Sequence, residues 1–352
     1  MNALAVPMRR RRLEISLPLC GLGVLLLTVV ALSLASGAMP LPVSEVVGAC
    51  WRVLSRQPAL PDDAIVLWLR LPRVLLAMLA GASLAISGAA MQGLFRNPLV
   101  EPGLIGVSSG AALGAIGMIV LGGGALAAWP AVLASFGVAG AAFVGGLAAT
   151  AVVYLFGRCR PGMATLLLAG IAINAVAMAG IGLLSFLADD RQLRDLSFWI
   201  LGSFGSSSWP RLLAVAPWML LALIGLPRHT AALNVLLLGE REAALLGFAP
   251  ARLRRRLVAL VALATGAAVA MCGAIGFVGL VVPHLIRMVW GPDHRLLLPA
   301  SALAGAALLV GADTLARLLV APAELPVGVI TALLGGPFFL WLLLRLRIGD
   351  AS

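Results

Sequence analysis

Residues 81–110 read GASLAISGAAMQGLFRNPLVEPGLIGVSSG, and this stretch decides the fold. It begins as the end of an apolar helix rich in small residues. It breaks at Arg96–Pro98 and again at Glu101–Gly103, and then continues as a second small-residue helix. Irregular backbone near a bilayer is tolerated only where it is buried in protein or lines a wet cavity. The stretch therefore predicts two membrane spans joined by a short polar elbow, where a substrate can be held or gated.

The composition extends this interpretation to the whole chain. Hydrophobic residues make up 62% of the sequence and charged residues only 11%, against roughly 25% charged residues in a soluble globular protein. Several runs without a charged residue are long enough for a span of about 20 residues. The sequence predicts an all-α polytopic membrane protein with ten spans, at residues 15–36, 65–93, 103–121, 127–156, 163–187, 211–227, 256–273, 279–291, 296–318 and 326–346.

The distribution of charge predicts the orientation. With the N-terminus inside, ten crossings also return the C-terminus inside. The inner side then holds 17 of the 25 arginines and 6 of the 14 acidic residues, so the whole net charge of +11 lies inside. Such an excess of arginine is the mark of the cytoplasmic side, and it needs no nucleic-acid partner to explain it. Residues 1–14 are predicted to be a basic cytoplasmic segment. The apolar run after them is nearly twice as long as the core of a signal peptide, which favours a retained span.

The longest inner loop, residues 228–256, contains the sequence LGEREAALLG from Leu238. Two acids in its first turn suit the positive end of a helix dipole, and Gly247 is a typical helix stop. The pattern predicts a short cytoplasmic helix, either a helix on the lipid surface or a lever pressed by a partner.

Three arginines stand on the outer side against the general trend: Arg70, Arg73 and Arg317. Two interpretations are open for Arg70 and Arg73. Their side chains either reach back to the membrane interface, or they form part of a basic ring on which an acidic partner docks. Arg317 either pairs with Asp313 one helical turn away or belongs to the same ring.

Catalytic and metal-binding patterns are missing from the sequence. The four cysteines are scattered and form no CxxC pair, as expected for small packing residues. The chain has no lysine, whereas a P-loop needs one on the nucleotide phosphates. We therefore expect a transport subunit that is not itself an enzyme and holds neither a metal nor a cofactor. Its energy comes from a partner ATPase, or from an ion gradient coupled to a titrating group such as Asp313 or His284.

The chain resembles the FecCD-type permeases of ATP-binding-cassette importers, which take up iron–siderophores, haem and vitamin B12. The resemblance extends over most of the chain from about residue 65 onward, with its motifs in the family order. These are RLPR from Arg70, residues 81–111, LLLAG from Leu166, FWILGSFG from Phe198, LGEREAALLG from Leu238, residues 273–306 and ELPVGVITALLGGPFFLWLL from Glu324.

This resemblance implies a single transmembrane permease domain over residues 1–352 with the type II importer architecture. It implies a homodimer with ten helices per subunit around one central pathway, in a bacterial inner membrane with both termini cytoplasmic. Two copies of a separate ATPase, which bind ATP and Mg, are implied on the cytoplasmic side. A periplasmic binding protein is implied on the other side.

The resemblance also implies roles for individual residues. Arg70, Arg73 and Arg317 match arginines that meet acidic residues of the binding protein. Asn97 and Leu99 match positions that line the cytoplasmic gate. A second gate element is in doubt, because residues 162–164 (Gly-Met-Ala) replace hydroxyl residues. The coupling helix, which sits in a cleft of the ATPase, is implied for Leu238, Gly239, Glu240, Ala243, Leu246 and Gly247.

The cargo is the least determined feature. The candidate pathway helices offer glycine, alanine, leucine, Met91 and Met163, which suits a large planar or macrocyclic chelate better than a small ion. Residues 291–295 (GPDHR) are similar to haem-importer relatives, so we expect haem first, ferric siderophores second and cobalamin third. His284 and His294 are predicted near the inner surface, where structural roles are favoured over axial ligation of haem.

Overall fold

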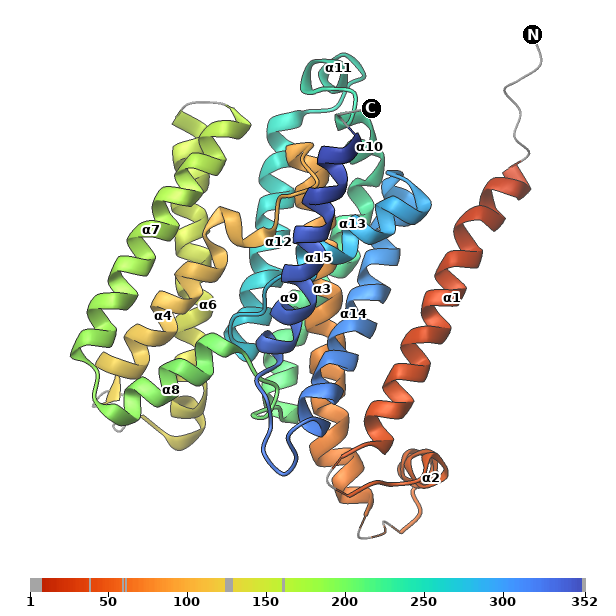
Figure 1. The fold of residues 1–352 in the computed structure, drawn as a ribbon, viewed down its shortest axis with the longest axis vertical. Helices are drawn as coiled ribbons and strands as arrows, with labels where there is room; N and C mark the ends of the chain where they lie inside the picture. The colour runs from red at the N-terminus through yellow and green to blue at the C-terminus, as the bar shows by residue number, and fades with distance from the viewer. Residues whose placement is uncertain are drawn as a thin grey trace.

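The computed structural model describes residues 8–37, 39–58, 60, 62–123, 129–159 and 162–349, and no strand occurs within them (Figure 1). Ten apolar helices in this part of the chain coincide with the ten predicted spans. Seven are long enough to cross a membrane, and α4, α13 and α15 supply shorter apolar segments. The ten are α1 (Met8–Ala35), α3 (Leu71–Phe95), α4 (Val107–Leu121), α6 (Ala131–Cys159), α7 (Met163–Leu187), α9 (Trp209–Gly225), α12 (Pro250–Cys272), α13 (Val278–Trp290), α14 (His294–Leu318) and α15 (Val327–Gly349).

Helix α3 is the centre of the molecule. A π-helical turn, Ile65–Arg70, leads into it, and α14, α12, α13 and α9 pack around it. Glycines allow this packing: a Cβ added at Gly81 would lie 2.2 Å from the carbonyl oxygen of Gly305, and one at Gly88 would lie 1.8 Å from that of Gly279. Without a hydrophobic driving force between helices in lipid, such close backbone approach supplies much of the contact energy.

The other helices flank this centre on two sides. Helices α4, α6 and α7 pack on one another and form one side of the molecule, whereas α1 lies along α14 at the opposite edge (Figure 1). The start of α1 and the end of α15 lie at the same end of the molecule (Figure 1). This arrangement agrees with an even number of crossings.

Short elements occupy the two ends of the bundle. At one end lie α10 (Thr230–Leu236), preceded by the 3₁₀ turn Leu226–His229, and α11 (Glu240–Leu245). At the other lie α2 (Val43–Leu54) and α8 (Asp190–Leu201) (Figure 1). Arg52 of α2 donates from Nε to Asp63 Oδ2 at 2.8 Å. This hydrogen bond lowers the pKa of the Asp63 carboxyl to about 2, so the pair stays ionised throughout the neutral range.

Some predicted boundaries differ from the observed ones. The first helix starts at Met8 rather than at residue 15, while residues 1–7 and the predicted start of the fourth span at residue 127 lie outside the described residues. The third span begins at Val107 because Pro102–Ile105 form a 3₁₀ turn and Gly106 adopts a φ of +83°. Helix α8, which no predicted span covers, starts at Asp190 because Asp189 and Gln192 form a capping box.

Candidate functional site

The elbow between α3 and α4 is built as its sequence predicts. Helix α3 ends at Phe95, and the φ of +51° at the next residue, Arg96, turns the chain out of the helix. Asn97 then accepts a hydrogen bond from the Leu99 backbone N–H at its Oδ1 atom, at 2.9 Å. Both side chains are exposed, with Leu99 at 36%. The two predicted gate residues therefore lie on one local turn at the surface of the elbow, and their gating role stays a prediction.

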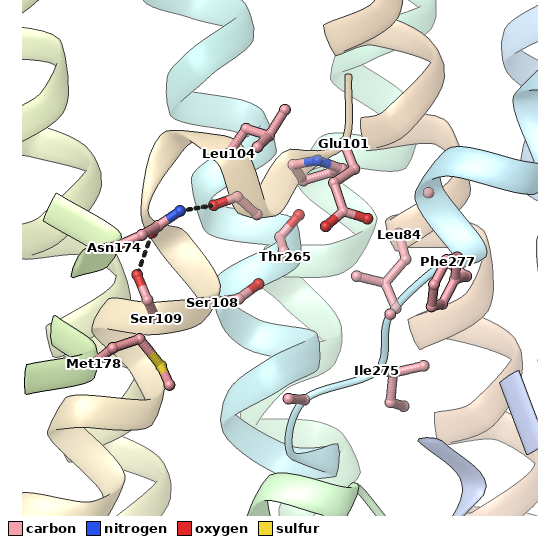
Figure 2. A pocket seen from close by; sticks show the side chains of 15 residues that line it. Leu84, Glu101, Leu104, Ser108, Ser109, Asn174, Met178, Thr265, Ile275 and Phe277 are labelled. Carbon is pink, nitrogen blue, oxygen red and sulfur yellow. Dashed lines mark hydrogen bonds between the residues drawn. The ribbon is translucent and has the colours of Figure 1, made fainter. Parts of the chain in front are cut away.

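A chamber of about 400 Å³ lies below this elbow, between the α4–α7 side of the molecule and the central helices (Figure 2). Its apolar lining includes Leu84, Met178 and Phe277. Its polar lining is formed by Glu101, Ser108, Ser109, Asn174 and Thr265. The chamber thus combines apolar walls with a few polar groups, as small-molecule sites usually do.

The polar side of the chamber is held by Asn174 of α7. Its Nδ2 atom donates to the Gly103 carbonyl at 3.4 Å, and its Oδ1 atom accepts from Ser109 Oγ of α4 (Figure 2). The elbow is thereby tied to α7 and α4. Glu101 points its carboxylate into the chamber (Figure 2) and has no ion-pair partner among the described residues.

A methionine lines this chamber, but it is neither of the two that the sequence analysis placed on the pathway. Met91 is completely buried within the packing of α3, and Met163 is partly buried against the main core. Met178 of α7 is the methionine that lines the chamber. A repeat of apolar residues on α7 does not indicate which of its faces borders a cavity, so this residue could not be chosen in advance.

The coupling-helix segment forms a short helix, α11, at the exposed tip of the loop. Glu240 Oε1 accepts from Arg254 Nη2 at 3.0 Å, and the Ala243 carbonyl accepts from the Phe248 N–H at 3.0 Å. Ala243 is 1% exposed, whereas Leu246 is 61% exposed. Only six residues are helical, because Gly239 and Gly247 adopt φ values of +136° and +85° on either side.

The apolar tip of this segment is suited to contact with another protein. Leu238, Leu245 and Leu246 are all exposed around a base that is fixed by Ala243 and Glu240. A rigid base with projecting leucines fits a lever better than a helix lying flat on lipid. The structure does not contain the partner, so the coupling role stays a prediction.

The three arginines that are predicted on the outer side, Arg70, Arg73 and Arg317, lie together, but they are largely engaged within the chain. Arg70 is 7% exposed and donates from Nη1 to the Leu34 carbonyl at 2.6 Å, with further contacts to the Ala35 and Met39 carbonyls. It therefore caps the C-terminal end of α1. This geometry differs from a side chain that reaches to the membrane interface.

Arg73 and Arg317 flank one buried carboxylate, that of Asp313. Arg73 Nη2 lies 2.9 Å from Asp313 Oδ1, and Arg317 Nε lies 3.3 Å from Asp313 Oδ2. The predicted pairing of Asp313 with Arg317 along the helix is confirmed. Arg317 also donates to Ser33 Oγ of α1 at 2.8 Å, and Arg73 Nη1 pairs with Glu324 at 2.9 Å.

His294 and His284 are both packed against other side chains of the chain. His294 is fully buried, and its Nδ1 atom lies 2.8 Å from Asn234 Oδ1. Its Nε2 atom faces Gly93 of α3, where an added Cβ would approach within 2.3 Å. This ring has no room for a haem iron. His284 lies on α13 beside the Phe338 ring, with ring centroids 6.3 Å apart.

Several known proteins are similar to this chain in sequence and in fold. Residues 25–345 match the FecCD transport family. The hemin transport system permease HmuU of Yersinia pestis is 49% identical over 93% of this chain and 96% of its own. The vitamin B12 import permease BtuC of Klebsiella pneumoniae is 40% identical over 94% of both chains. A solved inward-facing chain, assigned to the metal-chelate type of ABC transporters, superposes with a TM-score of 0.81 at 35% identity, over 93% of this chain and 98% of its own.

Proposed function

Because the chain belongs to the FecCD transport family, we propose that it is the permease subunit of an ATP-binding-cassette importer whose cargo is haem. The observation that carries this proposal is the 49% identity to a hemin permease along nearly the whole length of both chains. Cobalamin is the second candidate cargo, since cobalamin permeases match at 40–44% identity over similar lengths. Ferric siderophores are the third.

The proposed assembly contains two copies of this chain, two ATPase subunits and a periplasmic binding protein in a bacterial inner membrane. ATP and Mg bind to the ATPases, which supply the energy for alternating access. Helices α7 and α15 expose large apolar side chains, among them Leu168, Phe186 and Leu333, and the second copy is proposed to cover part of this surface. In a membrane, such surface must be covered by lipid or by protein.

Three parts of the chain divide the work in this proposal. Helix α11, at the cytoplasmic end, transmits closure of the ATPases through its base at Ala243 and Glu240. The elbow at Asn97 and Leu99 opens or closes the inner side of the pathway. The chamber behind the elbow forms part of the pathway wall, where apolar walls and few polar groups hold a chelate weakly enough to release it.

Docking of the binding protein is proposed at the outer arginine cluster. Arg70 is occupied by α1 carbonyls, so Arg73 is the better candidate for contact with an acidic side chain. Its partner Glu324 is 44% exposed. An incoming carboxylate can replace Glu324 on Arg73 without breaking the buried pair with Asp313.

The experiment is ATP-dependent uptake into liposomes that contain this chain, its ATPase and its binding protein. Haem, a ferric siderophore and cobalamin are compared under the same conditions. We expect haem uptake that needs both ATP and the binding protein. If only cobalamin were taken up, the proposed cargo would be wrong and the proposed mechanism would stand. Uptake driven by a proton gradient without ATP would refute the importer mechanism.

A pair of variants tests the chamber in the same assay. Ser108→Leu adds bulk to the chamber wall and is expected to lower uptake. Ser185→Leu is the matched control, because Ser185 lies on α7 away from the chamber and its hydroxyl donates only to its own helix at the Ile181 carbonyl. Equal uptake by both variants would mean that the chamber is not part of the pathway.

A further inference from the structure

A second, strongly basic pocket lies at the α11 end of the molecule, between the 3₁₀ turn Leu226–His229 with the start of α10 and the first turns of α12. It has a volume of about 330 Å³ and is lined by Arg228, His229, Arg252 and Arg256. Gly247 and Phe248, which follow α11, close one side of it. None of the residues that line the pocket is acidic. It therefore concentrates positive charge at one place on the surface.

The guanidinium groups of this pocket are not neutralised by the chain. In the part that the structure describes, Arg228, Arg252 and Arg256 form no ion pair, and the nearby Glu240 is taken by Arg254. Arg228, in the 3₁₀ turn that follows α9, donates one hydrogen bond to the Ile224 carbonyl in the last turn of α9. Clustered guanidiniums without a carboxylate are suited to an anion that accepts two hydrogen bonds from each group, and a phosphate has this geometry.

The surface next to the pocket indicates the source of that phosphate. Helix α9 exposes Leu213, Leu220, Leu221 and Ile224 along one face. Arg228 follows Ile224 by four residues, one helical turn further toward the α11 end. An exposed apolar face that ends in a basic pocket matches a phospholipid, with its acyl chains on the leucines and its headgroup among the arginines.

We propose that this pocket binds the phosphate headgroup of an anionic phospholipid from the leaflet at the α11 end. The proposal requires only that the chain spans a membrane, and it is independent of the cargo. It has one consequence for the proposed transporter. A bound headgroup beside Gly247 and Phe248 would fix the C-terminal side of the α11 segment.

The test is native mass spectrometry of the purified full-length chain titrated with phosphatidylglycerol and, in parallel, with phosphatidylcholine. We expect the chain to retain phosphatidylglycerol preferentially. Arg252→Gln should weaken its binding about tenfold, the loss expected for one charge-assisted contact. The matched control is Arg255→Gln, which removes one exposed charge from the same turn of α12 but does not line the pocket.

Several outcomes would overturn the proposal. Equal binding of phosphatidylcholine, or an equal loss with Arg255→Gln, would show unspecific attraction to the basic surface. Displacement of the lipid by millimolar inorganic phosphate would identify a site for a soluble phosphate. If Arg252→Gln lost association with the ATPase while it kept phosphatidylglycerol, the pocket would be a protein-docking site.

Discussion

Arg73 and Asp313 are 240 residues apart in sequence, yet their side chains form a two-pronged ion pair, Nη2 to Oδ1 at 2.9 Å and Nε to Oδ2 at 3.0 Å. The Asp313 side chain is only 2% exposed. The pair fastens α3 to α14 at the α2 end of the bundle, and Arg317 adds the end of α1 to the same cluster. One carboxylate thus holds three helices together.

Asp313→Asn should destabilise the chain strongly. The substitution leaves Arg73 and Arg317 close together with no buried carboxylate between them. Breaking a buried ion pair in this way costs about 3–5 kcal/mol, which thermal unfolding in detergent should register as a large fall in melting temperature. Glu324→Gln is the control, because it removes the exposed partner of the same arginine and should cost no more than about 1 kcal/mol. Equal losses would contradict the central role of Asp313.

Arg73→Gln should weaken docking of the binding protein and reduce its dependence on salt. Exposed charge pairs are screened beyond about 10 Å at 0.1 M salt, so docking to the intact cluster should weaken as salt rises. Affinity measured across a salt series tests this. Arg70→Gln is the comparison. Both substitutions should lower stability, because Arg73 pairs with the buried Asp313 and Arg70 holds α1 carbonyls, but the salt dependence of docking should stay in Arg70→Gln. A salt dependence unchanged by Arg73→Gln would remove Arg73 from the docking surface.

The spans and the elbow could be predicted from sequence because their causes are local. A run of about 20 residues without charge needs lipid around it. The stretch 96–103, with two charged residues and two prolines, separates two such runs. Glycine-rich helices such as α3 indicate close packing in the same way. These features do not depend on which helices become neighbours.

The contacts between helices could not be predicted, because they depend on neighbours far away in sequence. Arg70 looked like an outward-facing charge, but it lies against the end of α1 and is used as a cap. Asn174 lies in an apolar run, and nothing in its local sequence indicates that it meets Ser109 and the Gly103 carbonyl. Helix α2 lies in a stretch between two strong spans and was not predicted.

Gly93→Ala should destabilise the α10 end of the bundle. The new methyl group would lie 2.3 Å from His294 Nε2, and Asn234 holds the ring from its other side at 2.8 Å. Overpacking of this kind costs about 1–3 kcal/mol, measured as a lower melting temperature. Gly140→Ala on α6 meets open space and should be neutral or slightly stabilising.

The identity of the clashing group can be tested by a second substitution. His294→Ala removes the imidazole, so adding Gly93→Ala to it should cost much less than Gly93→Ala costs in the native background. A full and additive loss in the double variant would mean that the two sites do not interact, and the close approach of α3 and α14 at Gly93 would need another explanation.

Ala243→Pro should separate ATP hydrolysis from transport. Proline removes the hydrogen bond from the Ala243 N–H to the Gly239 carbonyl, which is 3.1 Å long, and it disturbs the buried base of α11. The spans do not depend on this bond, so the chain should still assemble with its ATPase. ATPase activity and uptake are measured on the same liposomes, and uptake should be lost in larger proportion.

Leu246→Asp tests whether the exposed tip of the same segment contacts the ATPase. If Leu246 enters a cleft of the ATPase, a buried, unpaired carboxylate there should weaken association of the two subunits, as measured by co-purification. Arg241→Gln is the control, because Arg241 is exposed on α11 but is not one of the projecting leucines. The two variants give different information: Ala243→Pro tests whether motion passes through the base, and Leu246→Asp tests whether the tip is where the partner binds. Retained uptake in Ala243→Pro together with lost association in Leu246→Asp would make α11 an anchor for the ATPase rather than a lever.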